Sequence, residues 1–135
     1  MITAVDTSVL LDIFFPDPTF GPLSKAKLRA VSGEGALIVC EVVYAEVAGL
    51  FPRPSDLESF LDASGIQLKP SSSETLWKAG ELWKKFCLAR PHHPERTRRL
   101  LADFLIGAHA LMQAERLLTR DKDFFHATFT GLRLA

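Results

Sequence analysis

The fold is decided at the start of the chain, in the stretch Ile2-Thr3-Ala4-Val5-Asp6-Thr7-Ser8-Val9-Leu10-Leu11-Asp12. Its first four residues form a short apolar run, which predicts a buried strand. The pattern of residues 7–15 predicts a short helix. We expect this helix to end before Pro16 and Pro18, because a proline disfavours helical backbone in the residue before it. A strand that passes directly into a helix is typical of α/β proteins, so we expect that class.

The same alternation of short apolar runs and helical patterns continues along the chain. Further strands are predicted over residues 36–39, 66–68, 116–119 and 132–134, and further helices over residues 23–31, 42–50, 54–64, 71–86 and 96–114. This order predicts one domain over residues 1–135, an α/β sandwich with a mostly parallel sheet of about five strands. In such sheets, functional sites form beyond the carboxyl ends of the strands.

The charge of the chain is unevenly distributed. With 47% hydrophobic and 24% charged residues, the composition excludes a disordered or collagen-like chain. The formal net charge is zero, but residues 1–68 carry nine acidic and four basic residues (−5), and residues 69–135 carry seven acidic and twelve basic residues (+5). The balanced total therefore does not exclude a nucleic-acid partner.

Cysteine content and hydropathy indicate the compartment. Cys40 and Cys87 lack metal-type spacing, and we interpret both as buried small side chains in a reducing cytosol, with a disulfide as the alternative. Asp6 and Asp12 interrupt the first apolar stretch, so it does not resemble a signal peptide. No apolar run approaches the length of a membrane span. We expect a soluble, cytoplasmic protein without a membrane partner.

Four acidic residues stand where carboxylates are unusual. Asp6 and Asp121 each follow a predicted strand, whereas Glu46 and Asp103 lie inside helices that are otherwise nearly all apolar. A buried carboxylate is costly unless it is paired, protonated or bound to a metal. Each acid also has a simpler explanation on its own. Asp6 and Asp121 could be helix N-caps, Glu46 could pair with an arginine, and Asp103 could form a salt bridge with Arg99.

A single pocket that collects all four acids is a better explanation than four unrelated roles. Their oxygen ligands, without a set of cysteine and histidine ligands, favour Mg²⁺ or Mn²⁺ over zinc. The sequence therefore predicts a divalent-metal site at the carboxyl edge of the sheet.

Several blocks of the sequence resemble a known family. Asp6-Thr7-Ser8-Val9-Leu10-Leu11-Asp12 resembles the opening of PIN-domain ribonucleases, especially the VapC-type toxins of toxin–antitoxin pairs. Further similar blocks follow in the family's order and extend the resemblance over nearly the whole chain: Val42-Val43-Tyr44-Ala45-Glu46, Asp103-Phe104-Leu105-Ile106-Gly107-Ala108-His109-Ala110, Leu117-Leu118-Thr119-Arg120-Asp121 and Phe129-Thr130-Gly131-Leu132-Arg133-Leu134. The resemblance implies a three-layer α/β/α PIN-like fold with an acidic metal site at one end.

The resemblance also implies which residues form that site. The catalytic and metal-binding acids would be Asp6, Glu46, Asp103 and Asp121. The hydroxyls of Thr7 and Thr119 would support them, directly or through water. Asp123 is an auxiliary candidate ligand or a first-turn helix acid, and we interpret Asp12 and Glu41 as surface or first-turn acids.

An acidic site needs basic contacts elsewhere to hold a polyanion. The segment from Lys84 to Arg99 is rich in cations and is either a solvated helix end with a turn or a surface that grips RNA phosphates. The candidate RNA-binding residues are Arg96, Arg98, Arg99, Arg120 and Lys122.

The remaining aromatic and histidine residues have structural interpretations. We do not expect His92 and His93, in the loop around Pro91, to be metal ligands, and we interpret His109 as a hydrogen-bonded core or interface residue. Trp77 and Trp83 are expected in the core or on a partner-binding surface.

The resemblance implies a Mg²⁺- or Mn²⁺-dependent endoribonuclease that acts as a toxin, with a cognate antitoxin and a homodimer as partners. One alternative is a housekeeping PIN nuclease in RNA processing or decay. Another is a receiver-like signalling module that binds Mg²⁺ around a phosphorylated aspartate. That module needs adjacent acids after its first strand, where this chain has Asp6 alone. A non-catalytic binding domain is a further alternative, but such a domain would not need the four acids.

Overall fold

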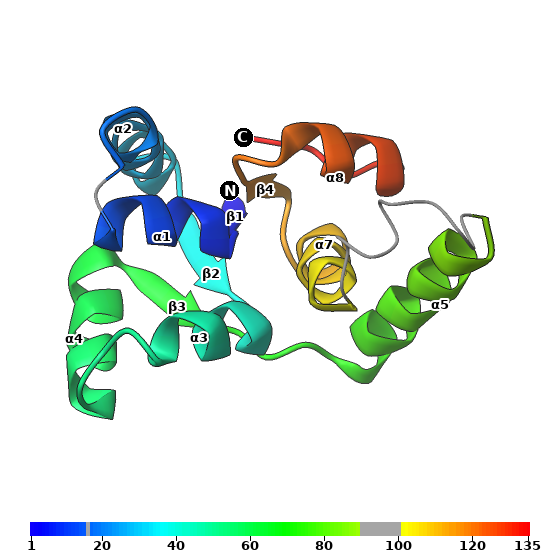
Figure 1. The fold of residues 1–135 in the computed structure, drawn as a ribbon, viewed down its shortest axis with the longest axis horizontal. Helices are drawn as coiled ribbons and strands as arrows, with labels where there is room; N and C mark the ends of the chain where they lie inside the picture. Colours follow the sequence, from blue (N-terminus) through cyan, green and yellow to red (C-terminus); the bar gives the residue numbers. More distant parts are fainter. Residues whose placement is uncertain (16, 90–100) are drawn as a thin grey trace.

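The computed structural model describes residues 1–15, 17–89 and 101–135. Its centre is a parallel sheet in the order β3-β2-β1-β4 (Figure 1). The strands are β1 (Ile2–Val5), β2 (Ala36–Val39), β3 (Ile66–Leu68) and β4 (Arg116–Leu118). The last three residues of both β1 and β2 are buried, as expected for parallel strands covered on both faces.

The strand order places a functional site next to β1. The chain runs outward from β1 through β2 to β3, and then returns to the other side of β1 with β4. The register aligns Val5 with Leu118, so β1 and β4 end side by side. A ligand site in an open parallel sheet forms where the strand order reverses in this way.

Helices follow most of the strands. They are α1 (Thr7–Phe14), α2 (Phe20–Ser32), α3 (Glu41–Ala48), α4 (Pro54–Ser64), α5 (Ser73–Ala89), α7 (Leu101–Gln113) and α8 (Lys122–Thr128). Local sequence sets several of their ends. Pro54 begins α4 and Gly65 ends it with a φ of +68°, a conformation that glycine adopts readily. At the start of α5, the backbone N–H of Thr75 donates to Ser72 Oγ at 3.2 Å.

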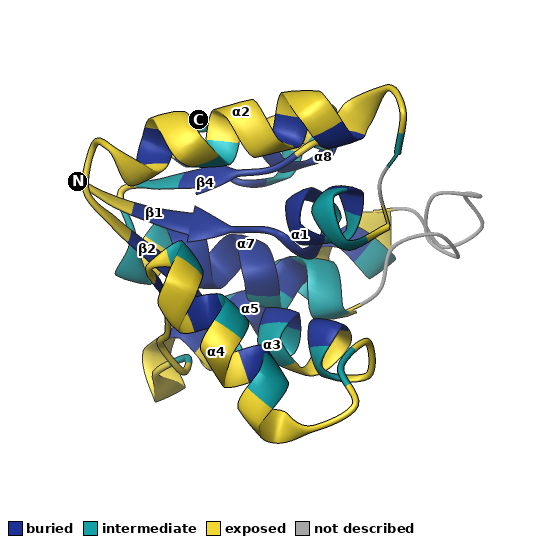
Figure 2. Cartoon of the chain, turned by 90° about the vertical axis from the view of Figure 1, so that its left-hand side faces the viewer, coloured by how far each residue is buried: buried dark blue, intermediate teal, exposed yellow. Residues whose placement is uncertain are grey.

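The helices form two layers around the sheet. Figure 2 shows α2 over one face of the sheet and α7 against the other, with α5 on the outer side of α7. Aromatic rings pack the junction of α7 and α8, where Phe104 lies 5.6 Å from Phe124 and 6.0 Å from Phe129 between ring centroids. The predicted three-layer α/β/α architecture is confirmed.

The expected strand over residues 132–134 forms less than a full strand. Leu134 makes one parallel bridge to Leu117, and the N–H of Ala135 donates to the carbonyl of Leu117 at 2.9 Å. In the described residues, the sheet therefore has four strands and a single bridge beyond β4. The sequence predicted about five strands. In the same residues, no helix has the length and apolar character needed to cross a bilayer.

Candidate functional site

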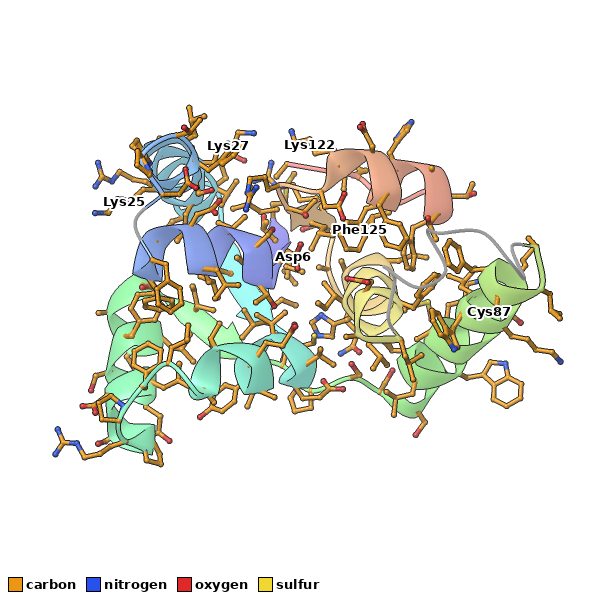
Figure 3. The ribbon with its side chains drawn as sticks, in the orientation of Figure 1. Asp6, Lys25, Lys27, Cys87, Lys122 and Phe125 are labelled. Atoms are coloured by element: carbon orange, nitrogen blue, oxygen red, sulfur yellow. The ribbon has the colours of Figure 1, made fainter. Side chains whose placement is uncertain are left out.

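Asp6 lies where β1 ends and α1 begins. Its backbone is extended, at φ −80° and ψ 152°, and its side chain does not cap the helix, so the N-cap explanation is wrong for this residue. Instead, its Oδ2 accepts two hydroxyl hydrogen bonds, from Ser8 Oγ at 3.1 Å and from Thr119 Oγ1 at 2.7 Å. Figure 3 shows Asp6 in the middle of the molecule, between the start of α1 and α7.

The electrostatic environment of Asp6 disfavours its negative charge. The residue is only 7% exposed, and this burial raises the pKa of its carboxyl group. Hydrogen bonds from Thr119, Ser8 and the Thr7 backbone act in the opposite direction, and the nearby negative charge of Asp103 raises the pKa further. Two neighbouring carboxylates, one of them buried, form a place where a bound cation removes an electrostatic penalty.

Asp103 and Asp121 approach this place from two other elements. Asp103 is half-buried in the first turn of α7. Asp121 follows β4, and its backbone N–H donates to Thr119 Oγ1 at 3.0 Å, while its side chain does not cap α8. The Thr119 hydroxyl thus donates to Asp6 and accepts from Asp121, which ties together the ends of β1 and β4. This is a supporting position of the kind expected for Thr119.

Glu46 differs from the sequence expectation in its environment. The interpretation of a carboxylate buried in an apolar helix is wrong, because Glu46 is exposed on α3. Its Oε1 accepts a hydrogen bond from the buried Thr7 Oγ1 at 2.8 Å. Since Thr7 follows Asp6 directly, this bond holds the Glu46 side chain towards the start of α1.

The structure brings the four acids to one region without closing them around an ion. Asp6 interacts with Asp103 electrostatically, with Asp121 through Thr119, and with Glu46 through its neighbour Thr7. Among residues 1–15, 17–89 and 101–135, however, no three acid, histidine or cysteine side chains converge closely enough to hold a metal. Asp123, the auxiliary candidate, is exposed in the first turn of α8.

The donor chemistry fits a hard divalent cation. The polar side chains around Asp6 offer carboxylate and hydroxyl oxygens, the ligands that Mg²⁺ and Mn²⁺ prefer. His109, a histidine on α7, is 1% exposed, and its Nε2 lies 2.7 Å from the Lys69 carbonyl. The expectation that His109 is a hydrogen-bonded core residue is confirmed.

Sequence reasoning missed a second buried carboxylate. Asp12 was expected at the surface or in a first turn, but it is 4% exposed near the end of α1. Its Oδ2 accepts from Ser24 Oγ at 2.7 Å and Arg120 Nε at 3.0 Å, and its Oδ1 accepts from Arg120 Nη2 at 3.1 Å. Asp12 stands in an apolar run, Val9-Leu10-Leu11-Asp12-Ile13, which is the same signal that singled out Asp103.

The pairing with Asp12 also changes the role of Arg120. Its guanidinium is engaged by the Asp12 carboxylate and lies 4.3 Å from the centre of the Phe20 ring. Arg120 therefore links α1, α2 and the end of β4, and its role as an RNA contact stays a prediction for a side chain that is 44% exposed. Glu41 lies in the first turn of α3, as expected, where it accepts hydrogen bonds from the Ser71 backbone and hydroxyl.

The other candidates fall into three groups. Arg96, Arg98, Arg99, His92 and His93 lie outside the described residues. Both cysteines are free, so the alternative of a disulfide is wrong. Cys40 is buried as expected, whereas Cys87, which was also expected to be buried, is only partly buried. The two tryptophans differ in their environments. The ring centroids of Trp83 and Phe104 lie 5.2 Å apart, whereas Trp77 is 77% exposed.

Known proteins share this architecture. The family model described as "PIN domain" matches residues 3–129 of the chain. Two solved structures each superpose with a TM-score of 0.69 at 18% sequence identity over all of this chain: VapBC2 from Rickettsia felis, bound to a DNA fragment from its promoter, and VapBC-1 from nontypeable Haemophilus influenzae. The superpositions cover 98% and 97% of those chains respectively. No curated protein sequence matches the chain significantly.

Proposed function

The chain belongs to the PIN-domain family, and from this premise we propose that it is a divalent-metal-dependent ribonuclease that hydrolyses RNA phosphodiester bonds. One observation carries the proposal: the buried Asp6 carboxylate lies beside the charge of Asp103 at the carboxyl edge of a parallel sheet. Neighbouring like charges destabilise a fold unless a cation lies between or beside them, and this favours a divalent-metal site here.

In this proposal, Asp6, Glu46, Asp103 and Asp121 hold Mg²⁺ or Mn²⁺. When bound, a divalent ion activates water and stabilises charge on the phosphate oxygens. The chain's own residues position the acids: Ser8 and Thr119 fix Asp6 Oδ2, and Thr7 fixes Glu46. The proton released by the attacking water is assigned to this group of acids and not to one of them.

RNA cleavage by the purified chain tests this chemistry. We expect cleavage with Mg²⁺ or Mn²⁺, none with EDTA, and loss of cleavage in Asp6→Asn and Asp103→Asn, which remove a charge while keeping the size of the side chain. Asp62→Asn, a matched change of an exposed acid on α4, should cleave like the unmodified chain. Cleavage that persists in EDTA, or in both site variants while they remain folded by circular dichroism, would exclude the proposed metal chemistry.

We further propose that the biological role is that of a toxin held inactive by an antitoxin, with the chain acting as a homodimer. The support is the resemblance to VapC-type toxins and the shared fold with two VapBC structures. Expression of the chain alone should arrest growth, and Asp6→Asn should remove the effect. Co-expression of a small DNA-binding protein encoded beside it should restore growth. Harmless expression of a cleavage-competent chain would favour a housekeeping nuclease.

A further inference from the structure

A basic hollow lies between α2, α8 and the end of β4. Its volume is about 310 Å³, and its walls include the cations Lys27, Arg120 and Lys122 and the apolar side chains Leu23 and Leu118. Lys27 comes from the middle of α2 and Lys122 is the first residue of α8. Figure 3 shows these two lysines near each other, between α2 and the start of α8. Residues distant in sequence thus bring three cations to one small space.

Two of these cations have no acidic partner among the described residues. Arg120 is paired with Asp12 through two hydrogen bonds. Within the part of the chain that the structure describes, neither Lys27 nor Lys122 forms an ion pair with an acid, and both are exposed. The neighbouring ammonium group of Lys122 lowers the pKa of Lys27 from its usual value. This agrees with the shared position of the two side chains on the wall of the hollow.

The other polar groups of the hollow are already occupied. Ser24 Oγ donates to Asp12, and Thr119 Oγ1 donates to Asp6. With these hydroxyl protons committed, the donors left for a ligand are the two lysine ammonium groups and the N–H groups of Arg120 that do not bind Asp12. An anion with several acceptor oxygens, such as a phosphate group, can accept from both ammonium groups at once.

The position of the hollow indicates which phosphate it would hold. Thr119 lines the hollow and also donates to Asp6, so the hollow begins beside the candidate catalytic acids. On the basis of the proposed ribonuclease function, we propose that Lys27 and Lys122 form a subsite for a backbone phosphate of the RNA substrate, next to the scissile position. Lysines that contact phosphate fix the position of a strand without reading its bases. The subsite would therefore position RNA without contributing sequence specificity.

The experiment uses the full chain and three single variants. Lys27→Gln and Lys122→Gln each remove one ammonium group from the hollow. Lys25→Gln makes the same change on α2, but Lys25 lines a different hollow, together with Asp17. In chloride without phosphate, the two hollow variants should be about as stable as the unmodified chain, because both lysines are exposed.

The first measurement is the Tm in inorganic phosphate against chloride at equal ionic strength. Phosphate should raise the Tm of the unmodified chain and of Lys25→Gln, and this rise should be lost in Lys27→Gln and Lys122→Gln. An equal rise in all four proteins, or no rise in any, would overturn the anion site. This measurement does not depend on ribonuclease function.

The second measurement is the binding of a labelled single-stranded RNA in EDTA, across a salt series. We expect several-fold weaker binding in Lys27→Gln and Lys122→Gln, and a slope of log Kd against log salt that is smaller by about 0.7 for each lost contact. Unchanged RNA binding in variants that have lost the phosphate effect would overturn the assignment to RNA. If the unmodified chain itself fails to bind or cleave RNA, the proposed function fails, and the assignment to RNA with it, whatever the phosphate result.

Discussion

The link between Asp12 and Arg120 leads to an asymmetric stability prediction. The Asp12 side chain is 4% exposed, whereas that of Arg120 is 44% exposed. Arg120→Met keeps most of the aliphatic stem but leaves a buried carboxylate with Ser24 Oγ as its remaining side-chain donor. Removing one partner of a buried ion pair costs about 3–5 kcal/mol. Because only Asp12 of this pair is fully buried, we expect a loss at the lower end, about 3 kcal/mol, in the free energy of unfolding.

The reciprocal change should cost much less. Asp12→Asn leaves Arg120 unpaired, but this guanidinium reaches water, and the Asn carbonyl still accepts the hydrogen bond from Ser24. We expect a loss of about 1 kcal/mol, close to that of one ordinary hydrogen bond. The double variant should lose less than the sum of the two single losses, because the buried charge that Arg120→Met leaves unpaired is then absent.

Urea denaturation of the three variants and the unmodified chain, followed by circular dichroism at neutral pH, measures these differences. A loss below about 0.5 kcal/mol for Arg120→Met would indicate an ordinary surface ion pair and refute the reasoning. A larger loss for Asp12→Asn than for Arg120→Met would refute it as well, since the order of the two follows directly from their burial.

Two further predictions concern the core of α7. In Gly107→Ala, the new Cβ would clash with the ring of the buried Phe129, so unfolding in urea should show a loss of about 1–3 kcal/mol in the free energy of unfolding. Adding Phe129→Leu should recover part of this loss, and an additive double variant would show that the ring is not the cause. Burial lowers the pKa of His109 below its usual value near 6.5, so the unfolded chain takes up a proton before the folded chain does. The free energy of unfolding should therefore fall as the pH decreases from 7.5 through 6.5. The variant His109→Gln, whose amide can still donate to the Lys69 carbonyl, should lose this part of the pH dependence. An identical pH profile in the variant would contradict the prediction.

The strands and the positions of the strand-end acids were predictable from sequence. A run of four apolar residues bounded by polar residues fits a buried strand in a sheet that helices cover on both faces. Parallel strands end at the same edge of the sheet, so the residues that follow them lie at that edge. Asp6 was found in this way, and its bond with Thr119 follows from the pairing of β1 with β4.

Apolar runs surround both Asp12 and Glu46, but they do not tell which of the two acids is buried, because α1 and α3 are helices of only eight residues with apolar side chains on most faces. In so short a helix, periodicity does not determine which face packs inward. Docking of α1 against α2 buries Asp12, and docking of α3 leaves Glu46 in solvent. Tertiary packing decides both outcomes. The hollow between Lys27 and Lys122 likewise depends on how α2 and α8 meet, which local sequence does not encode.

The most direct test of the account is the binding of Mn²⁺ in solution, measured by the loss of the free-ion signal in electron paramagnetic resonance. The account predicts that the unmodified chain and Asp62→Asn bind Mn²⁺ equally well, while Asp6→Asn and Asp103→Asn bind it at least about tenfold more weakly, because each removes a charged ligand. Equal Mn²⁺ affinity in all four folded proteins would contradict the claim that Asp6 and Asp103 hold the catalytic metal.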